Sequence, residues 1–247
     1  MAMKVAVMVT CINDALYPGT GKAVVRVLSE LGVDLDVPTA QTCCGQPMIN
    51  SGYMDQAVPV VRAFASAFEG YDAIVTPSAS CAGSVRHQHS LVARRSEDPK
   101  LAAAIQGLSP RVYELSEFLT DVLGVEDVGA SFPHRVAYHR TCHATRMIHS
   151  DDRAARLLRA VRGIELVEPE GADQCCGFGG TFAVGNADVS IAMGTDKVRA
   201  VQATQAHVLV AADNSCLMHI GGMLSRERDG MRVMHLAEIL AAREPVT

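Results

Sequence analysis

The sequence places a cysteine pair directly before a glycine twice, in Thr42-Cys43-Cys44-Gly45 and in Gln174-Cys175-Cys176-Gly177. The other four cysteines stand at similar intervals before and after these pairs, so the eight fall into two sets with the same order. The sets are Cys11, Cys43, Cys44 and Cys81, and Cys142, Cys175, Cys176 and Cys216. Inert buried cysteines are common as single residues, but they have no reason to fall into one register twice. The pattern therefore predicts a duplicated site with four thiols in each half of the chain.

Similar signals of secondary structure surround both cysteine pairs. Short apolar, β-branched runs predict strands, and apolar residues at helical spacing predict the helices between them. The expected strands are 3–10, 33–37 and 73–76 in the first half and 135–141, 164–167 and 207–212 in the second. The expected helices are 21–31, 55–69 and 112–123, followed by 152–161, 188–205 and 234–242. This alternation predicts an α/β fold of two pseudo-symmetric β-α-β-α-β halves, with parallel sheets covered by helices.

Glycine, serine and proline gather at 127–133, between the last expected helix of the first half and the first expected strand of the second. Such a stretch is typical of a connection between structural units. We therefore predict one cysteine-rich module at residues 1–130 and a second at residues 131–247.

Composition limits the classes of protein to which the chain can belong. Hydrophobic residues make up 49% and charged residues 20% of the chain, which excludes a disordered protein. A net charge of −5 with a pI near 6.0 argues against nucleic acid as a partner, because phosphate binding needs a basic face. No apolar run is long enough for a transmembrane segment, and the first residues read as a strand rather than as a signal peptide. We therefore expect a cytoplasmic protein, in which cysteine clusters indicate metal or redox chemistry more often than disulfides.

Each cysteine position follows an expected strand. Because ligands of an open parallel sheet gather outside the carboxyl ends of its strands, the four thiols of each half should converge there. Zinc, an iron–sulfur cluster and a redox disulfide are the three candidates for each set. Structural zinc is usually held by Cys-x2–4-Cys knuckles, which neither half contains. A cysteine pair suits a larger group with several metal atoms, as in iron–sulfur clusters.

Three stretches carry a resemblance to a known family: Thr10-Cys11-Ile12-Asn13-Asp14-Ala15-Leu16, Thr42-Cys43-Cys44-Gly45-Gln46-Pro47-Met48-Ile49-Asn50-Ser51-Gly52-Tyr53 and Cys175-Cys176-Gly177-Phe178-Gly179-Gly180-Thr181-Phe182. They are similar to the lactate-utilisation protein A family, and the match continues to Val233-Met234-His235-Leu236-Ala237-Glu238, over essentially the whole chain. The two cysteine sets also resemble the "CCG" domains of heterodisulfide reductase and of the glycolate oxidase iron–sulfur subunit.

The resemblance implies a cofactor, an activity and partners. Each module would be a CCG domain that binds an iron–sulfur cluster, [4Fe-4S] in type, with zinc as a substitute after aerobic handling. The chain would be an iron–sulfur subunit of a bacterial complex that oxidises L-lactate to pyruvate. Its partners would be two further subunits, one of them ferredoxin-like.

One motif departs from the heterodisulfide reductase pattern. In that enzyme the last cysteine of the domain belongs to a Cys-x-x-Cys motif, which provides a fifth thiolate for a noncubane [4Fe-4S] cluster. Here Ser84 stands three residues after Cys81, and His219 stands three residues after Cys216. Neither half therefore has the fifth cysteine that such a five-thiolate cluster needs. Four cysteines can hold a standard cluster, and His219 is either a nitrogen ligand or an ordinary polar residue of a helix.

Basic residues around Cys142 form a further candidate site. Arg140, His143 and Arg146, together with His139, could bind the carboxylate of a small acid. The alternative is plain counter-charge for a cluster or a solvated face. Elsewhere, the amides Asn13, Gln46 and Asn50 either orient sulfurs or cap turns, and His87 and His89 are expected in a polar loop without a role.

Three functions stay open at this point. The chain is an electron-transfer subunit of a lactate-oxidising complex, a cluster-based thiol–disulfide reductase subunit, or a non-redox protein in which zinc stabilises a partner-binding surface. The sequence has no flavin or nicotinamide fingerprint, so we expect a redox subunit that is inactive alone.

Overall fold

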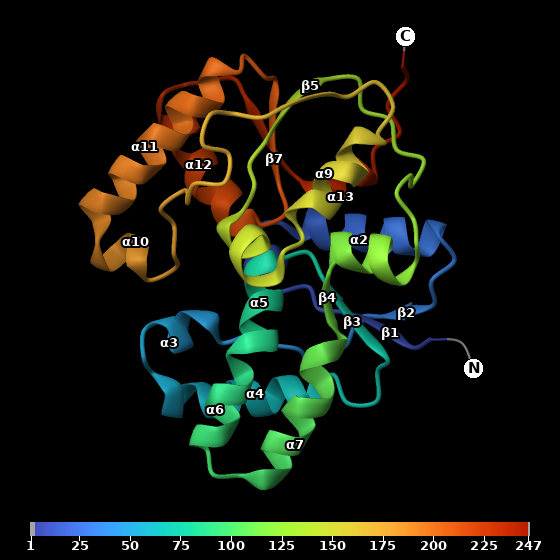
Figure 1. The fold of residues 1–247 in the computed structure, drawn as a ribbon, viewed down its shortest axis with the longest axis vertical. Coiled ribbons are helices and arrows are strands. Elements are labelled where there is room, and N and C mark those ends of the chain that lie inside the picture. The colour runs from blue at the N-terminus through green and yellow to red at the C-terminus, as the bar shows by residue number, and fades with distance from the viewer. Residues whose placement is uncertain (1–2, 247) are drawn as a thin grey trace.

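The computed structural model describes residues 3–246 and contains two parallel four-stranded sheets with equivalent strand orders, β2-β1-β3-β4 and β6-β5-β7-β8 (Figure 1). The strands of the first sheet are β1 (Val5–Val7), β2 (Leu35–Asp36), β3 (Ala73–Thr76) and β4 (Val112–Glu114). Those of the second are β5 (Arg135–Tyr138), β6 (Glu165–Val167), β7 (Val208–Ala211) and β8 (Arg232–His235). The predicted α/β fold with two similar halves and parallel sheets is confirmed.

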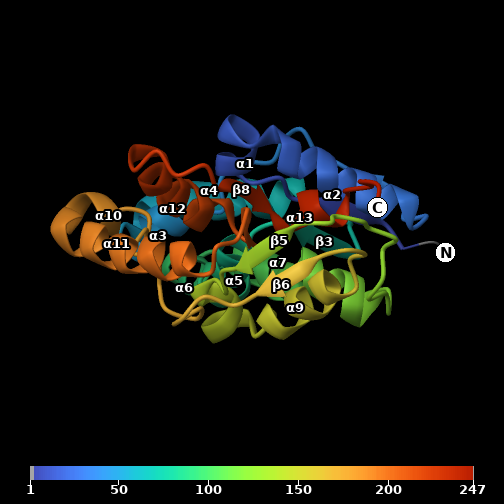
Figure 2. The same ribbon diagram turned by 90° about the horizontal axis from the view of Figure 1, so that it is seen from above.

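Helices connect the strands and cover the sheets. In the first half they are α1 (Cys11–Leu16), α2 (Pro18–Glu30), α3 (Gln46–Asn50), α4 (Met54–Ala67), α5 (Ala79–His87), α6 (His89–Arg95), α7 (Pro99–Leu108), η1 (Ser109–Arg111), α8 (Leu115–Glu117) and the π-helical turn η2 (Phe118–Val122). In the second half they are the π-helical turn η3 (Ala144–Ile148), α9 (Asp151–Arg159), α10 (Phe182–Gly185), α11 (Ala187–Ala203), α12 (Asn214–Arg226) and α13 (Leu236–Leu240). Figure 2 shows α2 on one side of the strands and α9 on the other.

The first β-α unit illustrates why these residues form these elements. All three residues of β1 are buried and apolar, as expected for a strand inside a parallel sheet. Helix α2 begins with Pro18, which has no N–H to leave unpaired at a helix start. It buries Val24, Val27 and Leu28 on one face. Gly32 follows the helix at φ 77°, a backbone conformation that glycine adopts without a side-chain clash.

The predicted helices 112–123 and 234–242 were wrong at their first residues. Val112–Glu114 forms β4 beside β3, and Arg232–His235 forms β8 beside β7, so each half has four strands instead of three. The helices α8 and α13 begin only after these strands. Both runs combine a strand and a helix without a glycine or proline between them, so their apolar spacing alone did not reveal the change.

The predicted polar loop around His87 and His89 was also wrong. His87 ends α5, and His89 begins α6 and is fully buried against Phe64. The two helices α6 and α7 have no counterpart between β7 and β8, the equivalent strands of the second half. Their charged residues face solvent while His89, Val92, Leu101 and Ile105 enter the core, a division that only packing reveals.

One apolar core runs through both halves. It includes Val27 and Phe118 from the first half and Leu158 and Ile239 from the second. Helix α13 contacts both α2 and α9. The two sheets therefore share a core. The division into modules at residues 1–130 and 131–247 stays a prediction from the sequence repeat.

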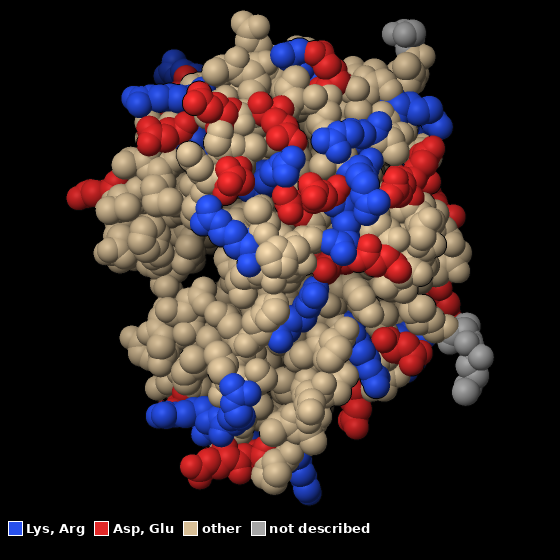
Figure 3. Space-filling model, viewed as in Figure 1, with Lys and Arg blue, Asp and Glu red and all other residues tan. Residues whose placement is uncertain are grey.

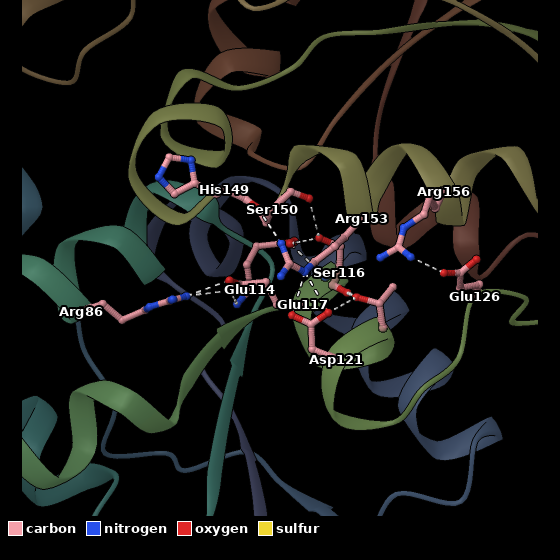
Figure 4. Close-up of polar contacts among 11 residues, drawn as sticks. Arg86, Glu114, Ser116, Glu117, Asp121, Glu126, His149, Ser150, Arg153 and Arg156 are labelled. Carbon is pink, nitrogen blue, oxygen red and sulfur yellow. Dashed lines mark hydrogen bonds and ion pairs between the residues drawn. The ribbon is translucent and has the colours of Figure 1, made fainter.

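Polar contacts supplement this core where α9 lies beside α8 and η2 (Figure 4). The Glu114 carboxylate accepts hydrogen bonds from the backbone N–H and the hydroxyl of Ser116. Arg153 of α9 binds the Asp121 carboxylate at 2.7 Å. The contact between Arg153 and Asp121 joins η2 of the first half to α9 of the second.

Between residues 3 and 246, the structure has no helix that is both long and apolar enough to cross a membrane.

Candidate metal centres

The cysteines lie beyond the carboxyl ends of the strands, as the sequence predicts. Cys11 opens α1 after β1, and Cys142 follows β5. Cys81 and Cys216 lie in the first turns of α5 and α12, which follow β3 and β7. The pairs lie in the loops that lead from β2 to α3 and from β6 to α10. In parallel sheets these ends share one edge, which brings distant thiols together.

In the first half the four thiols form a connected group. Cys11 Sγ lies 3.6 Å from Cys43 Sγ, and Cys44 Sγ lies 3.3 Å from Cys81 Sγ. The Gly45 N–H donates to Cys43 Sγ at 3.4 Å. Hydrogen bonds from Cys11 and Cys44 hold the pKa of Cys43 well below its usual range. This lowered pKa favours the thiolate form of Cys43, the form that binds metals.

In the second half the thiols repeat this arrangement. The Gly177 N–H donates to Cys175 Sγ at 3.4 Å. Hydrogen bonds from Cys142 and Cys176 hold the pKa of Cys175 well below its usual range, and a hydrogen bond from Cys176 lowers the pKa of Cys216. In each half, the pKa of the first cysteine of the pair is thus shifted in the direction that favours a thiolate.

Both groups of thiols line one cavity of about 140 Å³ between the two halves. All eight cysteines line it, with Gln46, Asn50 and His143 among the polar residues around them. Gln46 Nε2 and His143 Nε2 lie 3.1 Å apart across the two halves, and the hydroxyls of Ser51 and Thr181 lie 2.8 Å apart. Figure 3 shows the surface hollowed between the lobe of α10 and α11 and the lobe of α3, with mainly uncharged side chains on both rims.

The two cysteine-bearing helices are anchored to one another below the cavity. Ser78 caps α5 by accepting from the Cys81 N–H at 3.2 Å, and Asp213 caps α12 by accepting from the Ser215 N–H at 3.1 Å. The buried Asp213 carboxylate also accepts from the Ser80 N–H at 3.0 Å, across the boundary between the halves. Sequence reasoning missed both caps, although each stands three residues before the last cysteine of its set, a typical N-cap signal.

The basic residues predicted around Cys142 do not gather into one free cationic site. Arg140 is bound by Asp151 at 3.0 Å and by Glu168 at 2.8 Å. Arg146 donates to the backbone carbonyl of Asp173 at 3.5 Å. His143 lines the cavity, whereas Arg140 and Arg146 do not. The carboxylate partners of Arg140 come from segments whose proximity the sequence did not reveal.

Three further histidines lie in different surroundings, and of these only His89 differs from its predicted place in a polar loop. His219 Nε2 lies 3.5 Å from Ser190 Oγ, its ring packs against Phe178, and it is not among the residues that line the cavity. His89 donates from Nε2 to the Cys44 carbonyl oxygen at 2.8 Å, and burial lowers its pKa to about 4. His139 is fully buried beside Cys176 and Cys216.

The donor set fits a thiophilic metal centre in each half. All eight cysteines are free thiols, and peptide N–H groups point at the thiolate sulfurs. Soft thiolates select zinc and iron–sulfur clusters among biological metals. The clustered cysteines therefore indicate metal binding.

Comparisons with known proteins agree with this geometry. The family model described as "CCG: Cysteine-rich domain" matches residues 5–86 and 136–221, one match for each half. "Lactate utilization protein A" of Bacillus velezensis is 45% identical over 98% of this chain and 100% of its own length, and that of Geobacillus kaustophilus has the same identity and coverage. "Lactate utilization protein A 2" of Bacillus cereus is 40% identical over 97% of this chain and 98% of its own. The chain therefore belongs to the CCG cysteine-rich domain family, and within it to the group of the lactate utilization A proteins.

Proposed function

We propose that this protein is a cytoplasmic iron–sulfur electron-transfer subunit of a bacterial system that oxidises L-lactate to pyruvate. The observation that carries the proposal is the placement of both thiol groups on one cavity. The name shared by the similar bacterial proteins supports the link to lactate. Lactate oxidation releases two electrons, and two adjacent one-electron centres can accept them in sequence.

Each half would hold one [4Fe-4S] cluster, with its four cysteines as the ligands. When bound, such clusters accept and release single electrons at potentials set by their surroundings. The residues of this chain contribute to that setting. The Gly45 and Gly177 N–H groups donate to ligand sulfurs, which stabilises negative charge on them.

Partner subunits would dock at the rims of the cavity, two in number and one of them ferredoxin-like. Apolar side chains are exposed close in the chain to residues that line the cavity, such as Asn50 and Gly180. Tyr53 after α3 is 59% exposed, and Val184 in α10 is 86% exposed. Exposed apolar residues that are grouped near a site are typical of protein interaction surfaces.

The test is anaerobic purification followed by iron, zinc and acid-labile sulfide analysis with a visible absorption spectrum. We expect iron and sulfide in similar amounts and the broad visible absorption of clusters. Zinc without sulfide in protein kept anaerobic throughout would contradict the proposal and favour a zinc-stabilised binding protein.

A second measurement separates electron transfer from catalysis by this chain alone. The cluster-loaded protein should oxidise lactate slowly or not at all with an artificial acceptor, and activity should appear when the partner subunits are added. Rapid lactate turnover by the isolated chain would overturn the electron-transfer assignment. Cleavage of a disulfide substrate without lactate activity in the full complex would favour the thiol–disulfide reductase alternative.

A further inference from the structure

His139 lies near the second thiol group and is completely enclosed by protein. Its exposed fraction is 0%, and neither Nδ1 nor Nε2 makes a hydrogen bond of good geometry to residues 3–246, although contacts from Cys176 and His139 both lower the pKa of Cys216. A ring nitrogen of His139, Cys176 Sγ and Cys216 Sγ all lie within 4.8 Å of one another. A buried imidazole without a well-formed hydrogen bond is unfavourable, and a metal bound by the neighbouring sulfurs would satisfy one of its nitrogens.

The duplicated fold supplies a reference position for His139 in the first half. Met8 N–H donates to the Val75 carbonyl, and His139 N–H donates to the Val210 carbonyl, so the two residues directly follow β1 and β5 in the same register. Each stands three residues before the first cysteine of its set. Met8 is also fully buried, but its thioether is a much weaker donor than an imidazole.

The other histidines near the thiols already have polar partners or face elsewhere. His143 Nδ1 lies 3.5 Å from Cys142 Sγ, but its Nε2 contacts Gln46 and the residue is only partly buried. His89 in the first half donates to the Cys44 carbonyl oxygen rather than to a sulfur.

We propose that His139 is a nitrogen ligand of the metal centre in the second half, in place of one of the four thiolates assigned to that centre above, while the first centre keeps its four cysteines. This inference rests on the proposed function to the extent that the thiols bind a metal. Neutral imidazole is a common metal ligand in proteins. The enclosed position of His139 also excludes water from competing for the metal.

Histidine ligation makes the two centres unequal. A neutral nitrogen donor brings less negative charge to a centre than a thiolate, and histidine ligands raise the reduction potential of iron–sulfur centres. The second centre should therefore have the higher potential of the two. Electrons would move from the centre of the first half to that of the second.

The experiment uses the full chain with Cys43→Ser and Cys44→Ser, so that only the second centre can be loaded with iron and sulfide. Histidine is labelled with ¹⁵N, and pulsed electron paramagnetic resonance of the reduced centre measures nitrogen coupling. We expect a strong coupling of directly bound nitrogen, its loss in His139→Leu and His139→Gln, and its persistence in His219→Gln. A loaded centre without such coupling, or a coupling unchanged by His139→Gln, would overturn the inference and leave the proposed function intact.

A second arm decides the inference even if no iron centre forms, which would contradict the proposed function instead. The same protein is loaded with Co²⁺, and proton nuclear magnetic resonance detects the strongly shifted N–H signal of a metal-bound imidazole. Its presence in the parent and its absence in His139→Gln support the inference. Its absence from the cobalt-loaded parent overturns it. Far-ultraviolet circular dichroism of each variant identifies any loss caused by unfolding.

Discussion

The two thiol sites are built on the same β-α framework but differ in the side chains around the sulfurs. Each has a glycine N–H on the first thiol of its pair and a capped helix under its last cysteine. The first site has Met8 where the second has His139, and its outermost thiol, Cys11, is exposed while Cys142 is partly buried. The framework positions the sulfurs, and residues outside the repeated motif determine how the two centres differ.

The capping residues differ in the same way. The last helix of the first half is capped by Glu114 and that of the second by His235, both in capping boxes at the ends of strands. Both side chains are fully buried. The same capping position thus holds an acid in one half and a base in the other, because the backbone N–H there needs only a hydrogen-bond acceptor.

The largest difference between the halves should follow from removing one centre. Cys43→Ser should remove about half of the bound iron, and Cys175→Ser should remove the other half, because each site has its own four thiols. Far-ultraviolet circular dichroism should stay close to that of the unmutated protein, since the sheets are buried independently of the metal. Loss of all iron in either single variant would show that the centres do not form independently, and global unfolding would make the metal structural.

The two buried caps should give opposite dependences of stability on pH. Burial raises the pKa of Glu114 from 4.5 to about 8. Its contribution to the free energy of unfolding is therefore full below pH 4.5 and is lost as the pH rises toward 8. Burial lowers the pKa of His235 from 6.5 to about 4, so its contribution is full above pH 6.5 and is lost as pH falls through 4.

Urea unfolding from pH 4 to pH 8.5 checks both pH dependences. It compares the unmutated protein with Glu114→Gln and His235→Gln. Glu114→Gln should gain stability relative to the unmutated protein above pH 6, by a few kcal/mol at most. His235→Gln should gain below pH 6. Parallel curves for all three proteins would mean that neither buried group changes its protonation in the way described.

The caps beneath the cysteine helices should differ in strength. Asp213→Ala should lower the free energy of unfolding by about 3 kcal/mol, because it leaves the Ser80 and Ser215 N–H groups without their acceptor. Ser78→Ala should lower it by about 1 kcal/mol, as a single lost N-cap. Asp213→Asn keeps an acceptor oxygen and is the matched control. Equal losses of unfolding free energy in Asp213→Ala and Ser78→Ala would show that Asp213 does not bridge the two halves.

The smallest predicted difference concerns the glycines after the cysteine pairs. Gly45 has φ 81° and Gly177 has φ 90°, so alanine at either position costs about 1–2 kcal/mol in backbone strain. At Gly177 an added Cβ would also lie 2.7 Å from the Ser190 carbonyl oxygen, whereas at Gly45 the nearest atom is a Val60 methyl at 3.3 Å. Gly177→Ala should therefore be the more destabilising of the two by about 1 kcal/mol in urea unfolding. The reverse order would mean that the second loop adjusts more easily than the first.

Sequence reasoning found the elements whose signals are local. The apolar run of β1 and the helical spacing in α4 and α11 predicted a strand and two helices within a few residues of their observed bounds. The fourth strand of each half escaped because a short buried strand and the first turn of a helix have similar apolar content. Burial of His89 escaped because its polar neighbours face solvent while its own ring faces the core.

The sequence by itself determined the duplication, the parallel α/β halves and the four thiols assigned to each half, because the cysteines follow strands whose ends must lie at one sheet edge. Only the tertiary structure decided that both thiol groups line one cavity, that Arg140 is neutralised by Asp151 and Glu168, and that His139 lies enclosed beside Cys176 and Cys216. Those outcomes depend on how the two sheets pack through their shared core, and thus on contacts between residues far apart in the chain. Local periodicity specifies which face of an element is apolar, but not which distant side chain meets it.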